Sequence, residues 1–264
     1  MINPYLWILC IGHLIVDLGQ GILPIITPLL AQSLNLNYFQ VGTIALAFTF
    51  SSAIIQPVFG VLSDRYSMPW LMPLGLFLSG FGLALTGIVN SYGLLLFVVL
   101  LSGIGVAGYH PEGSKLAHYI SEDSKAGASM AVFSVGGNIG FGLGPMLAIF
   151  VLSFSGLGSI HGVMIPGVAA ALVFMFLLPR FKKILADNSP KEKKEKEQHK
   201  SSSRTKVGSL IILILYVTVR SWIHSGLVYF IPFYFPAFKG IAKPEYLIST
   251  FLIAGAIGTI LGGP

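Results

Sequence analysis

The sequence predicts an all-α protein that crosses a membrane several times, and three observations support that fold class. The 264 residues are 54% hydrophobic and only 10% charged, with a mean hydropathy of +0.81. A water-soluble fold needs a charged surface, which this composition does not supply. The apolar residues gather into eight segments, and Lys and Arg concentrate in every second break between them. We therefore expect a polytopic bundle of transmembrane helices.

The eight apolar segments are separated by breaks rich in Asn, Pro or Gly. They cover about 6–30, 41–63, 70–90, 93–118, 127–152, 162–179, 208–236 and 245–264. Lys and Arg follow the second, fourth and sixth segments, are absent after the first, third and fifth, and return weakly after the seventh. By the positive-inside rule, we expect the N-terminus and the even-numbered breaks to face the cytoplasm.

The net charge of +6 does not indicate a nucleic-acid partner, because its position explains it. Residues 180–206 hold ten Lys or Arg and four Asp or Glu, which accounts for the whole excess. We predict a basic cytoplasmic linker at 181–206, in which 187–206 form a flexible solvated loop. A short amphipathic helix on anionic lipid is the alternative there. The linker would separate a six-helix N-terminal bundle at 1–180 from two further helices at 207–264.

The first segment carries polar residues where apolar ones are expected. His13, Asp17 and Gln20 follow the i, i+4, i+7 spacing, so they lie on one helix face. A charge near the middle of a span costs about 2.5–3.5 kcal/mol, and such residues normally face a bundle interior or a wet cavity. We predict that Asp17, tuned by His13, carries a proton along a transport pathway. Polar residues that only lock helix to helix are the alternative.

Six spans, a basic loop and further spans are the layout of a transporter made of two bundles, so an internal repeat is expected. Pro-x3-Pro pairs close the first and seventh segments, at Pro24, Pro28, Pro232 and Pro236. Arg220 and His224 repeat the i, i+4 spacing of the polar pair in the first segment. We expect them to offer positive charge to an anionic substrate. For Arg220, the alternative is a buried pairing with an acid in a later span.

The second segment ends in a charged loop at the predicted cytoplasmic side. Gly60 precedes Asp64 and Arg65 there, and we expect Gly60 to let two helices approach closely while the charged pair caps neighbouring helix ends. This pattern resembles the loop between the second and third spans of major facilitator superfamily transporters. The resemblance implies a gating role for all three residues. A charged turn that only anchors topology is the alternative.

The fifth segment carries a glycine face that permits tight helix packing. It contains Gly136, Gly140 and Gly144 at every fourth position, and Pro145 then bends the helix. The Gly140–Pro145 spacing resembles the fifth-span signature of major facilitator antiporters, although two later glycines of that signature are replaced here. The resemblance implies a conformational role for these residues and favours export over import. Simple close packing is the alternative.

The fourth segment ends with His110, Glu112 and Lys115. His110 and Glu112 lie about 200° apart around a helix, so they cannot share a ligand, and no metal site is expected. Glu112 and Lys115 are three residues apart, and a structural ion pair and a gating role are equally consistent with that spacing. Where many relatives in the superfamily carry an arginine of the proton pathway, this sequence has Val99.

Five strings resemble a narrower family, the fosmidomycin resistance proteins, which are bacterial inner-membrane drug exporters. They are His13-Leu14-x2-Asp17, Gln56-Pro57-x2-Gly60, Tyr66-x-Met68-Pro69-Trp70, His110-Pro111-Glu112-x-Ser114 and Val135-Gly136-Gly137-Asn138. The resemblance implies the major facilitator superfamily fold, with a complete N-terminal bundle and the first two helices of the C-terminal bundle. It implies proton-coupled efflux of a small anionic compound such as fosmidomycin. We also expect Gln20, His110 and Asn138 among the substrate-binding residues.

The remaining expectations concern function classes and partners. We expect a monomer in the lipid bilayer of a bacterial inner membrane, with no cofactor, no metal and no nucleic acid. No Ser/His dyad with a glycine elbow and no His-Glu-x2-His string indicates an enzyme. An importer of a sugar, organic anion or amino acid is the main alternative. The sequence stops within its eighth segment, so we expect the front two thirds of a longer transporter, inactive alone.

Overall fold

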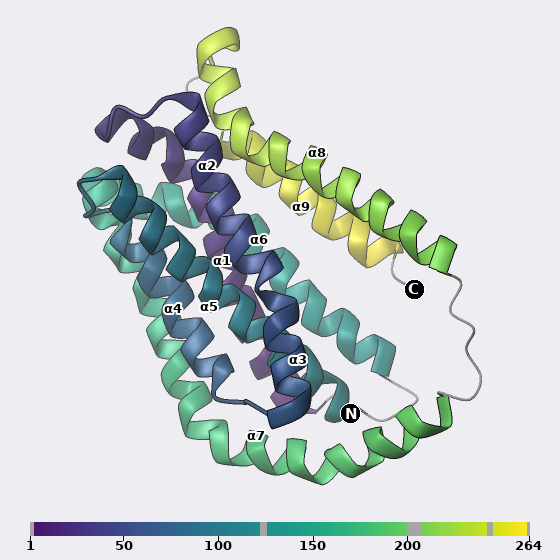
Figure 1. Ribbon diagram of the computed structural model, residues 1–264. Coiled ribbons are helices and arrows are strands. Elements are labelled where there is room, and N and C mark those ends of the chain that lie inside the picture. The colour runs from purple at the N-terminus through teal and green to yellow at the C-terminus, as the bar shows by residue number, and fades with distance from the viewer. Residues whose placement is uncertain (1–2, 122–125, 200–206, 242–244, 263–264) are drawn as a thin grey trace.

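The computed structural model describes residues 3–121, 126–199, 207–241 and 245–262, and these residues form helices and short connections without a strand (Figure 1). The predicted all-α class is confirmed. The α-helices are α1 (Pro4–Ser33), α2 (Tyr38–Thr49), α3 (Gln56–Tyr66), α4 (Leu71–Leu85), α5 (Tyr92–Tyr119), α6 (Ala126–Ser155), α7 (Met164–His199), α8 (Val207–Lys239) and α9 (Glu245–Gly262).

Five continuous helical stretches of the described chain are long and apolar enough to cross a membrane. They are Pro4–Ser33, Tyr38–Tyr66, Tyr92–Tyr119, Gly127–Asn188 and Ile211–Lys239. The fourth of these stretches contains nearly all of α6 and the first part of α7, which are joined by the 3-10 turn η3 (Gly156–Val163). The helices α4 and α9 are apolar but shorter. Each of the eight predicted segments therefore coincides with a helix or, for the second segment, with a pair of helices.

The second segment changes helix type in its middle. Between α2 and α3 the chain forms a π-helix, η1 (Phe50–Ile54), just before Pro57. Proline has no backbone N–H to donate to the preceding turn, and wider π-turns accommodate such interruptions. Within η1, Ser51 is fully buried, and its Oγ donates to the Ala47 carbonyl oxygen over 2.9 Å. Its side chain lies directly against Gly103 of α5, where a Cβ would leave no room.

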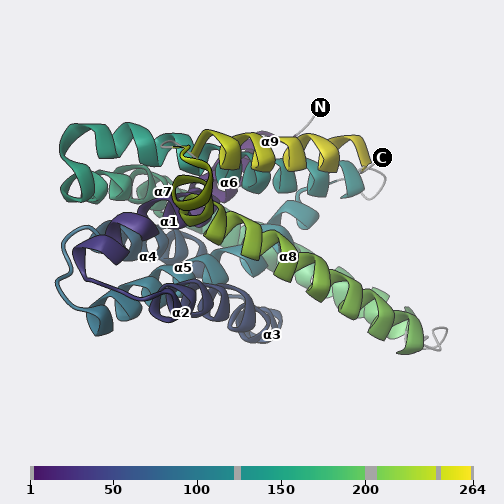
Figure 2. The same cartoon turned by 90° about the horizontal axis from the view of Figure 1, so that it is seen from above.

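The helix α6 packs along α1 with almost no side chain between them, because its glycines lie on the α1 backbone. Gly136 faces the carbonyl oxygen of Cys10, Gly140 that of Leu14, and Gly144 that of Leu18. The three contacts repeat every four residues on both helices, so that one straight seam joins them. The prediction of a glycine face for tight packing is confirmed. In Figure 2, seen from above, α1 and α6 lie side by side near the centre of the molecule.

Small residues also bring α4 against α5. A Cβ at Gly82 would lie 2.6 Å from the backbone nitrogen of Ser102. Ser102 Oγ donates to the carbonyl oxygen of Ser79 over 2.8 Å, so that the buried hydroxyl is satisfied across the interface. This contact fixes α5 beside the core that surrounds α1.

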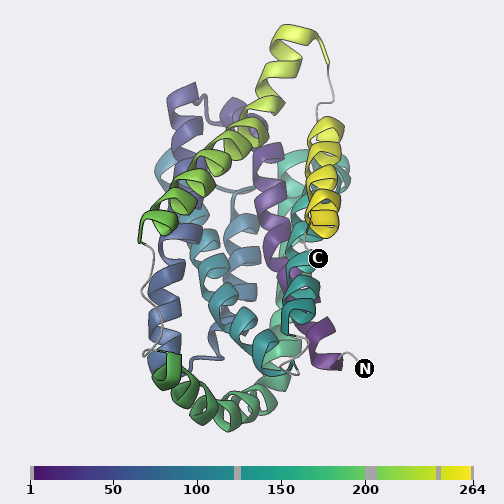
Figure 3. The same ribbon diagram turned by 90° about the vertical axis from the view of Figure 1, so that its right-hand side faces the viewer.

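The helix α7 extends well beyond the predicted segment 162–179 and ends at His199. Figures 1 and 3 show its later part passing across the end of the bundle where the N-terminus lies. The prediction of a flexible loop is therefore wrong for 187–199, and 200–206 lie outside the described residues. Residues 191–198 are all Lys, Glu or Gln, which are strong helix formers and can continue a helix without apolar packing.

The two helices after the linker rest on the face formed by α1 and α6. A Cβ at Gly142 of α6 would lie 3.2 Å from the Ile253 side chain of α9. Val228 of α8 forms a small buried cluster with Ile248 and Leu252 of α9. In Figure 2, α8 crosses over α1 and α9 runs beside α6. Most large apolar side chains of α8 are exposed in this chain, which leaves that helix largely uncovered.

Candidate functional site

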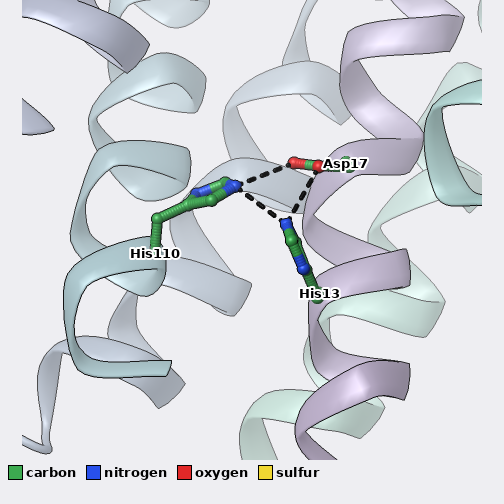
Figure 4. A group of neighbouring side chains, drawn as sticks. All are labelled: His13, Asp17 and His110. Atoms are coloured by element: carbon green, nitrogen blue, oxygen red, sulfur yellow. Dashed lines mark hydrogen bonds and ion pairs between the residues drawn. The ribbon is translucent and has the colours of Figure 1, made fainter. Parts of the chain in front are cut away.

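Two helices bring three ionisable side chains together inside the bundle (Figure 4). His13 and Asp17 lie one turn apart on α1, and His13 Nε2 is 3.2 Å from Asp17 Oδ2. His110 enters from α5, with its Nε2 3.4 Å from Asp17 Oδ1 and 3.1 Å from His13 Nε2. The ionisable pair predicted in the first segment is therefore part of a group of three, which we call the central cluster.

Hydrogen bonds to neighbouring groups orient each member of the central cluster. His13 Nδ1 lies 2.7 Å from the carbonyl oxygen of Phe133 on α6, and the two rings stack with centroids 4.2 Å apart. His110 Nδ1 lies 2.8 Å from the Val106 carbonyl oxygen one turn back on α5. Gln20 Nε2 donates to the aspartate Oδ1 over 2.6 Å. The reactive atoms of the cluster are thus held facing one another.

Two members of the central cluster are buried within the bundle, and the third, His110, is partly buried. His13 is 8% exposed and Asp17 is 7% exposed. Gly137 of α6 leaves space for them, since a Cβ there would overlap His13 Nε2 and lie 2.6 Å from Asp17 Oδ2. Among the described residues, the ion-pair partners of Asp17 are His13 and His110 alone. The prediction that the pair faces the interior is confirmed, and its role in proton coupling stays a prediction.

The central cluster is also the one group in the described part of the chain whose donor atoms are spaced for a metal ion. One donor atom each of His13, Asp17 and His110 lies within 4.8 Å of the other two. The sequence argument against a metal site considered only His110 and Glu112. The side chains of His110 and Glu112 do contact different groups, as expected. The group built from two helices was not found in the sequence, because no spacing along the chain connects α1 to α5.

The predicted substrate-binding residues are only partly brought together. Gln20 and His110 both contact Asp17, so the structure joins them to the predicted proton site rather than to a separate pocket. Within the described chain, no hydrogen bond or ion pair links the remaining three to the central cluster. These three are Arg220, which is exposed on α8; Asn138, which is partly buried on α6; and His224, whose ring lies 5.7 Å from that of Phe141 and 5.4 Å from that of Phe251.

A second polar group connects the end of α3 to α5. Glu112 is fully buried, and its Oε1 accepts hydrogen bonds from Ser63 Oγ at 2.7 Å and from the Met68 backbone nitrogen at 2.6 Å. Lys115 Nζ donates to the Ser63 carbonyl oxygen over 3.1 Å and lies 3.7 Å from Asp64 Oδ1. The ion pair between Glu112 and Lys115 that their spacing allowed is therefore not formed. Each of the two side chains instead binds to groups at or just after the end of α3.

The expected close helix approach at Gly60 is also wrong in the described part of the chain. A Cβ at Gly60 would meet nothing within 4 Å. Gly60 instead lines a cavity of about 440 Å³ together with Asp64, Lys115 and other residues of α3, α5 and α6. The neighbouring Arg65 is exposed. The glycine thus borders an open space between helix ends, whereas the glycines of α6 contact backbone directly.

Replacing Glu112 tests whether this carboxylate holds α3 to α5. Glu112→Ala is expected to lower the melting temperature of the detergent-solubilised chain, because the buried Ser63 hydroxyl and the partly buried Met68 nitrogen lose their acceptor, at up to about 1–3 kcal/mol each. Glu112→Gln keeps an oxygen in that place and should melt closer to the wild-type temperature. Asp187→Ala, at an exposed position of α7, serves as the control. Equal melting temperatures for all variants would contradict a structural role.

The fold and the central cluster agree with the sequence comparison, which places the chain in a class of membrane transporters. Residues 9–264 match the sequence profile of the Major Facilitator Superfamily, and the chain belongs to this superfamily.

Three curated relatives make the relationship more specific. The chain is similar to the fosmidomycin resistance protein of Escherichia coli (strain K12), with 30% identity over 255 residues, which cover 96% of this chain and 63% of that protein. It is 33% identical over 269 residues to the uncharacterized MFS-type transporter YfnC of Bacillus subtilis (strain 168), covering 100% of this chain and 65% of that protein. It is 28% identical over 178 residues to the putative multidrug resistance protein MdtD of Yersinia pestis (strain Pestoides F), covering 67% of this chain and 38% of that protein.

The chain spans just under two thirds of the length of the first two relatives. The resemblance to the fosmidomycin resistance proteins, inferred from five short strings, is confirmed by this similarity along nearly the whole chain.

Proposed function

We propose that the complete protein is a proton-coupled exporter of a small anionic compound such as fosmidomycin. The observation that carries this proposal is the buried carboxylate of Asp17, which forms ion pairs with His13 and His110 inside a transmembrane bundle of the Major Facilitator Superfamily. Ionisable groups at such depth are costly and mark ion or substrate pathways. Similarity to a fosmidomycin resistance protein and to a putative multidrug resistance protein supports export and the substrate class.

In this proposal Asp17 carries the proton and His13 tunes it. A carboxylate in a low-dielectric interior is stable only beside a positive charge or after protonation. Of the described residues, only histidines supply that charge here, and histidine gains and loses a proton near neutral pH. A proton bound by the cluster therefore supplies the positive charge that the buried carboxylate requires.

The conformational parts of the proposal lie on either side of the central cluster. Asp64 and Arg65, with Lys115 and Glu112, form a gate at the cytoplasmic end of the bundle. The glycine seam with Gly140, Gly144 and Pro145 lets α6 follow α1 as the bundles rock. The orientation, with a cytoplasmic N-terminus in the bacterial inner membrane, rests on the distribution of Lys and Arg between the segments.

The proposed organisation has a six-helix bundle at 1–180, a basic linker at 181–206 and the first helices of a second bundle at 207–264, of which 242–244 and 263–264 lie outside the described residues. The complete protein is proposed to work as a monomer. The charge of Arg220 would face an anionic substrate, with His224, Gln20 and Asn138 as further polar contacts. Arg220 is exposed in the present chain, which leaves it free to meet either a substrate or a residue of a later helix.

Transport assays with the complete protein test the direction and the substrate class. Everted membrane vesicles acidified inside are expected to accumulate labelled fosmidomycin, and dissipation of the pH gradient should stop that accumulation. Counterflow with phosphonates and with sugars then distinguishes an exporter of anions from an importer of another solute. Counterflow of sugars without any response to phosphonates would contradict the proposal.

Replacing Arg220 separates substrate recognition from coupling. Arg220→Gln is expected to raise the KM for fosmidomycin about tenfold or more, because a charge-assisted pair of hydrogen bonds to a phosphonate is lost. Arg220→Lys keeps the charge but not the planar fork and should lie between the two. An unchanged KM in Arg220→Gln, with normal protein levels, would show that this arginine serves a structural pairing instead.

A further inference from the structure

We propose that a single proton is shared by the three side chains of the central cluster, so that His110 of α5 is a proton-binding residue. This inference rests on the proposed proton coupling, adds His110 to it, and places the bound proton on a histidine Nε2 beside the Asp17 carboxylate rather than on the carboxylate itself. It also changes the role expected for His110, which the sequence placed among the substrate contacts. Which ring nitrogens already carry a hydrogen decides where the additional proton can bind.

Both histidines have their Nδ1 atom committed to a backbone carbonyl. A carbonyl oxygen only accepts, so His13 Nδ1 must donate to Phe133 and His110 Nδ1 must donate to Val106. A neutral imidazole carries one hydrogen on its two nitrogens, and in both rings that hydrogen is on Nδ1. In the neutral state, each Nε2 therefore presents a lone pair.

These two Nε2 atoms lie 3.1 Å apart, and both approach oxygens of Asp17. With both rings neutral and Asp17 ionised, four atoms with lone pairs would converge without a hydrogen between them. A proton on Asp17 would satisfy one contact and leave the contact between the two nitrogens unsatisfied. One additional proton on an Nε2 instead gives a donor that faces both the other ring and the carboxylate.

The remaining neighbours supply no competing charge. On α1 they include Cys10 and Gln20, and on α5 they include Tyr109, whose hydroxyl donates to the Leu9 carbonyl oxygen over 2.7 Å. The nearest part of α6 provides the Phe133 ring and Gly137. No lysine or arginine of the described chain forms an ion pair with Asp17. The proton on the cluster is therefore what neutralises this buried carboxylate.

Proton release changes the force between α1 and α5. With the proton bound, the carboxylate, one imidazolium and one neutral imidazole sum to zero charge. When the proton leaves Nε2 for water, that ring keeps its Nδ1 hydrogen, and the cluster becomes negative with facing lone pairs. Attraction between the two helices is then replaced by repulsion at this level. His110 thus links the protonation state to the position of α5.

Nitrogen NMR of the complete protein, labelled with ¹⁵N-histidine in lipid bilayers, tests this inference. The single substitutions His13→Gln, His110→Gln and His161→Gln assign the signals of the three histidines. His161 lies in η3, away from the cluster, and its signals serve as the control. Neutral His13 and His110 are expected to carry their hydrogen on Nδ1. In Asp17→Asn, the midpoint at which His110 loses its extra proton should move to lower pH by about one unit or more, because its counter-charge is gone. The signals of His161 should not change.

The outcomes separate this inference from the proposed function. A His110 signal that titrates at the same pH in wild type and in Asp17→Asn, or that is neutral with the hydrogen on Nε2, overturns the shared proton. Proton-driven transport could still depend on Asp17 in that case. Histidine signals that respond to EDTA and to added Zn²⁺ in wild type, but not in Asp17→Asn, would assign the three donors to a metal ion and would also overturn it.

Discussion

Asp17→Asn in the complete protein is expected to abolish proton-driven efflux, leaving accumulation in everted vesicles at the level of membranes without the protein. Asparagine has nearly the shape of aspartate and can accept the hydrogen bond from Gln20, but it cannot carry the negative charge that holds a proton in the central cluster. The amount of protein in the membrane should stay close to wild type. Counterflow, which needs no net proton movement, should persist.

Asp187→Asn is the matched control, because it makes the same chemical change at an exposed position of α7. Its efflux should equal that of wild type. If Asp17→Asn retains efflux that responds to the pH gradient, Asp17 is not the coupling residue. If counterflow is lost together with efflux, the substitution has damaged substrate binding or folding, and coupling has to be assigned to another group.

Gly140→Ala is expected to have the largest effect on folding. An added Cβ at this position would overlap the carbonyl oxygen of Leu14, which is backbone and cannot move aside. The two helices would have to separate along their seam, at a cost of about 1–3 kcal/mol or more. We expect a lower melting temperature in detergent and a reduced amount of protein in the membrane.

The control for this substitution is Gly127→Ala, in the first turn of the same helix, where a Cβ would meet nothing within 4 Å. Alanine is the better helix former, so this variant should melt at the wild-type temperature or slightly above it. Melting temperatures that fall equally in both variants would show that the contact between α1 and α6 does not determine the effect.

The fold could be predicted from the sequence because its signals are local. Apolar length and the alternation of Lys and Arg identified the segments, and the spacing of Gly136, Gly140 and Gly144 indicated a packed face. For the extension of α7 a loop was preferred and a short helix was the alternative, because a run of Lys and Glu is consistent with both. Gly60 was misjudged for a similar reason, since a glycine shows where close packing is possible and not where it occurs.

Two of the three members of the central cluster could be paired from the sequence, and the third could not. His13 and Asp17 were recognisable because one turn of helix places them together. His110 lies 97 residues after His13, and only the packing of α5 against α1 brings the two rings into contact. The Phe133 carbonyl and Gly137 carry no side-chain signal at all, although they orient and accommodate the cluster.

The glycine seam has a mechanical consequence. Where side chains interdigitate, a helix can slide or turn slightly by changing rotamers, but α1 and α6 touch through backbone and have no such slack. A tilt of either helix must therefore also tilt the other, and α9 packs against α6. Displacements that begin at the carboxylate of Asp17 would in this way reach the helices beyond the linker.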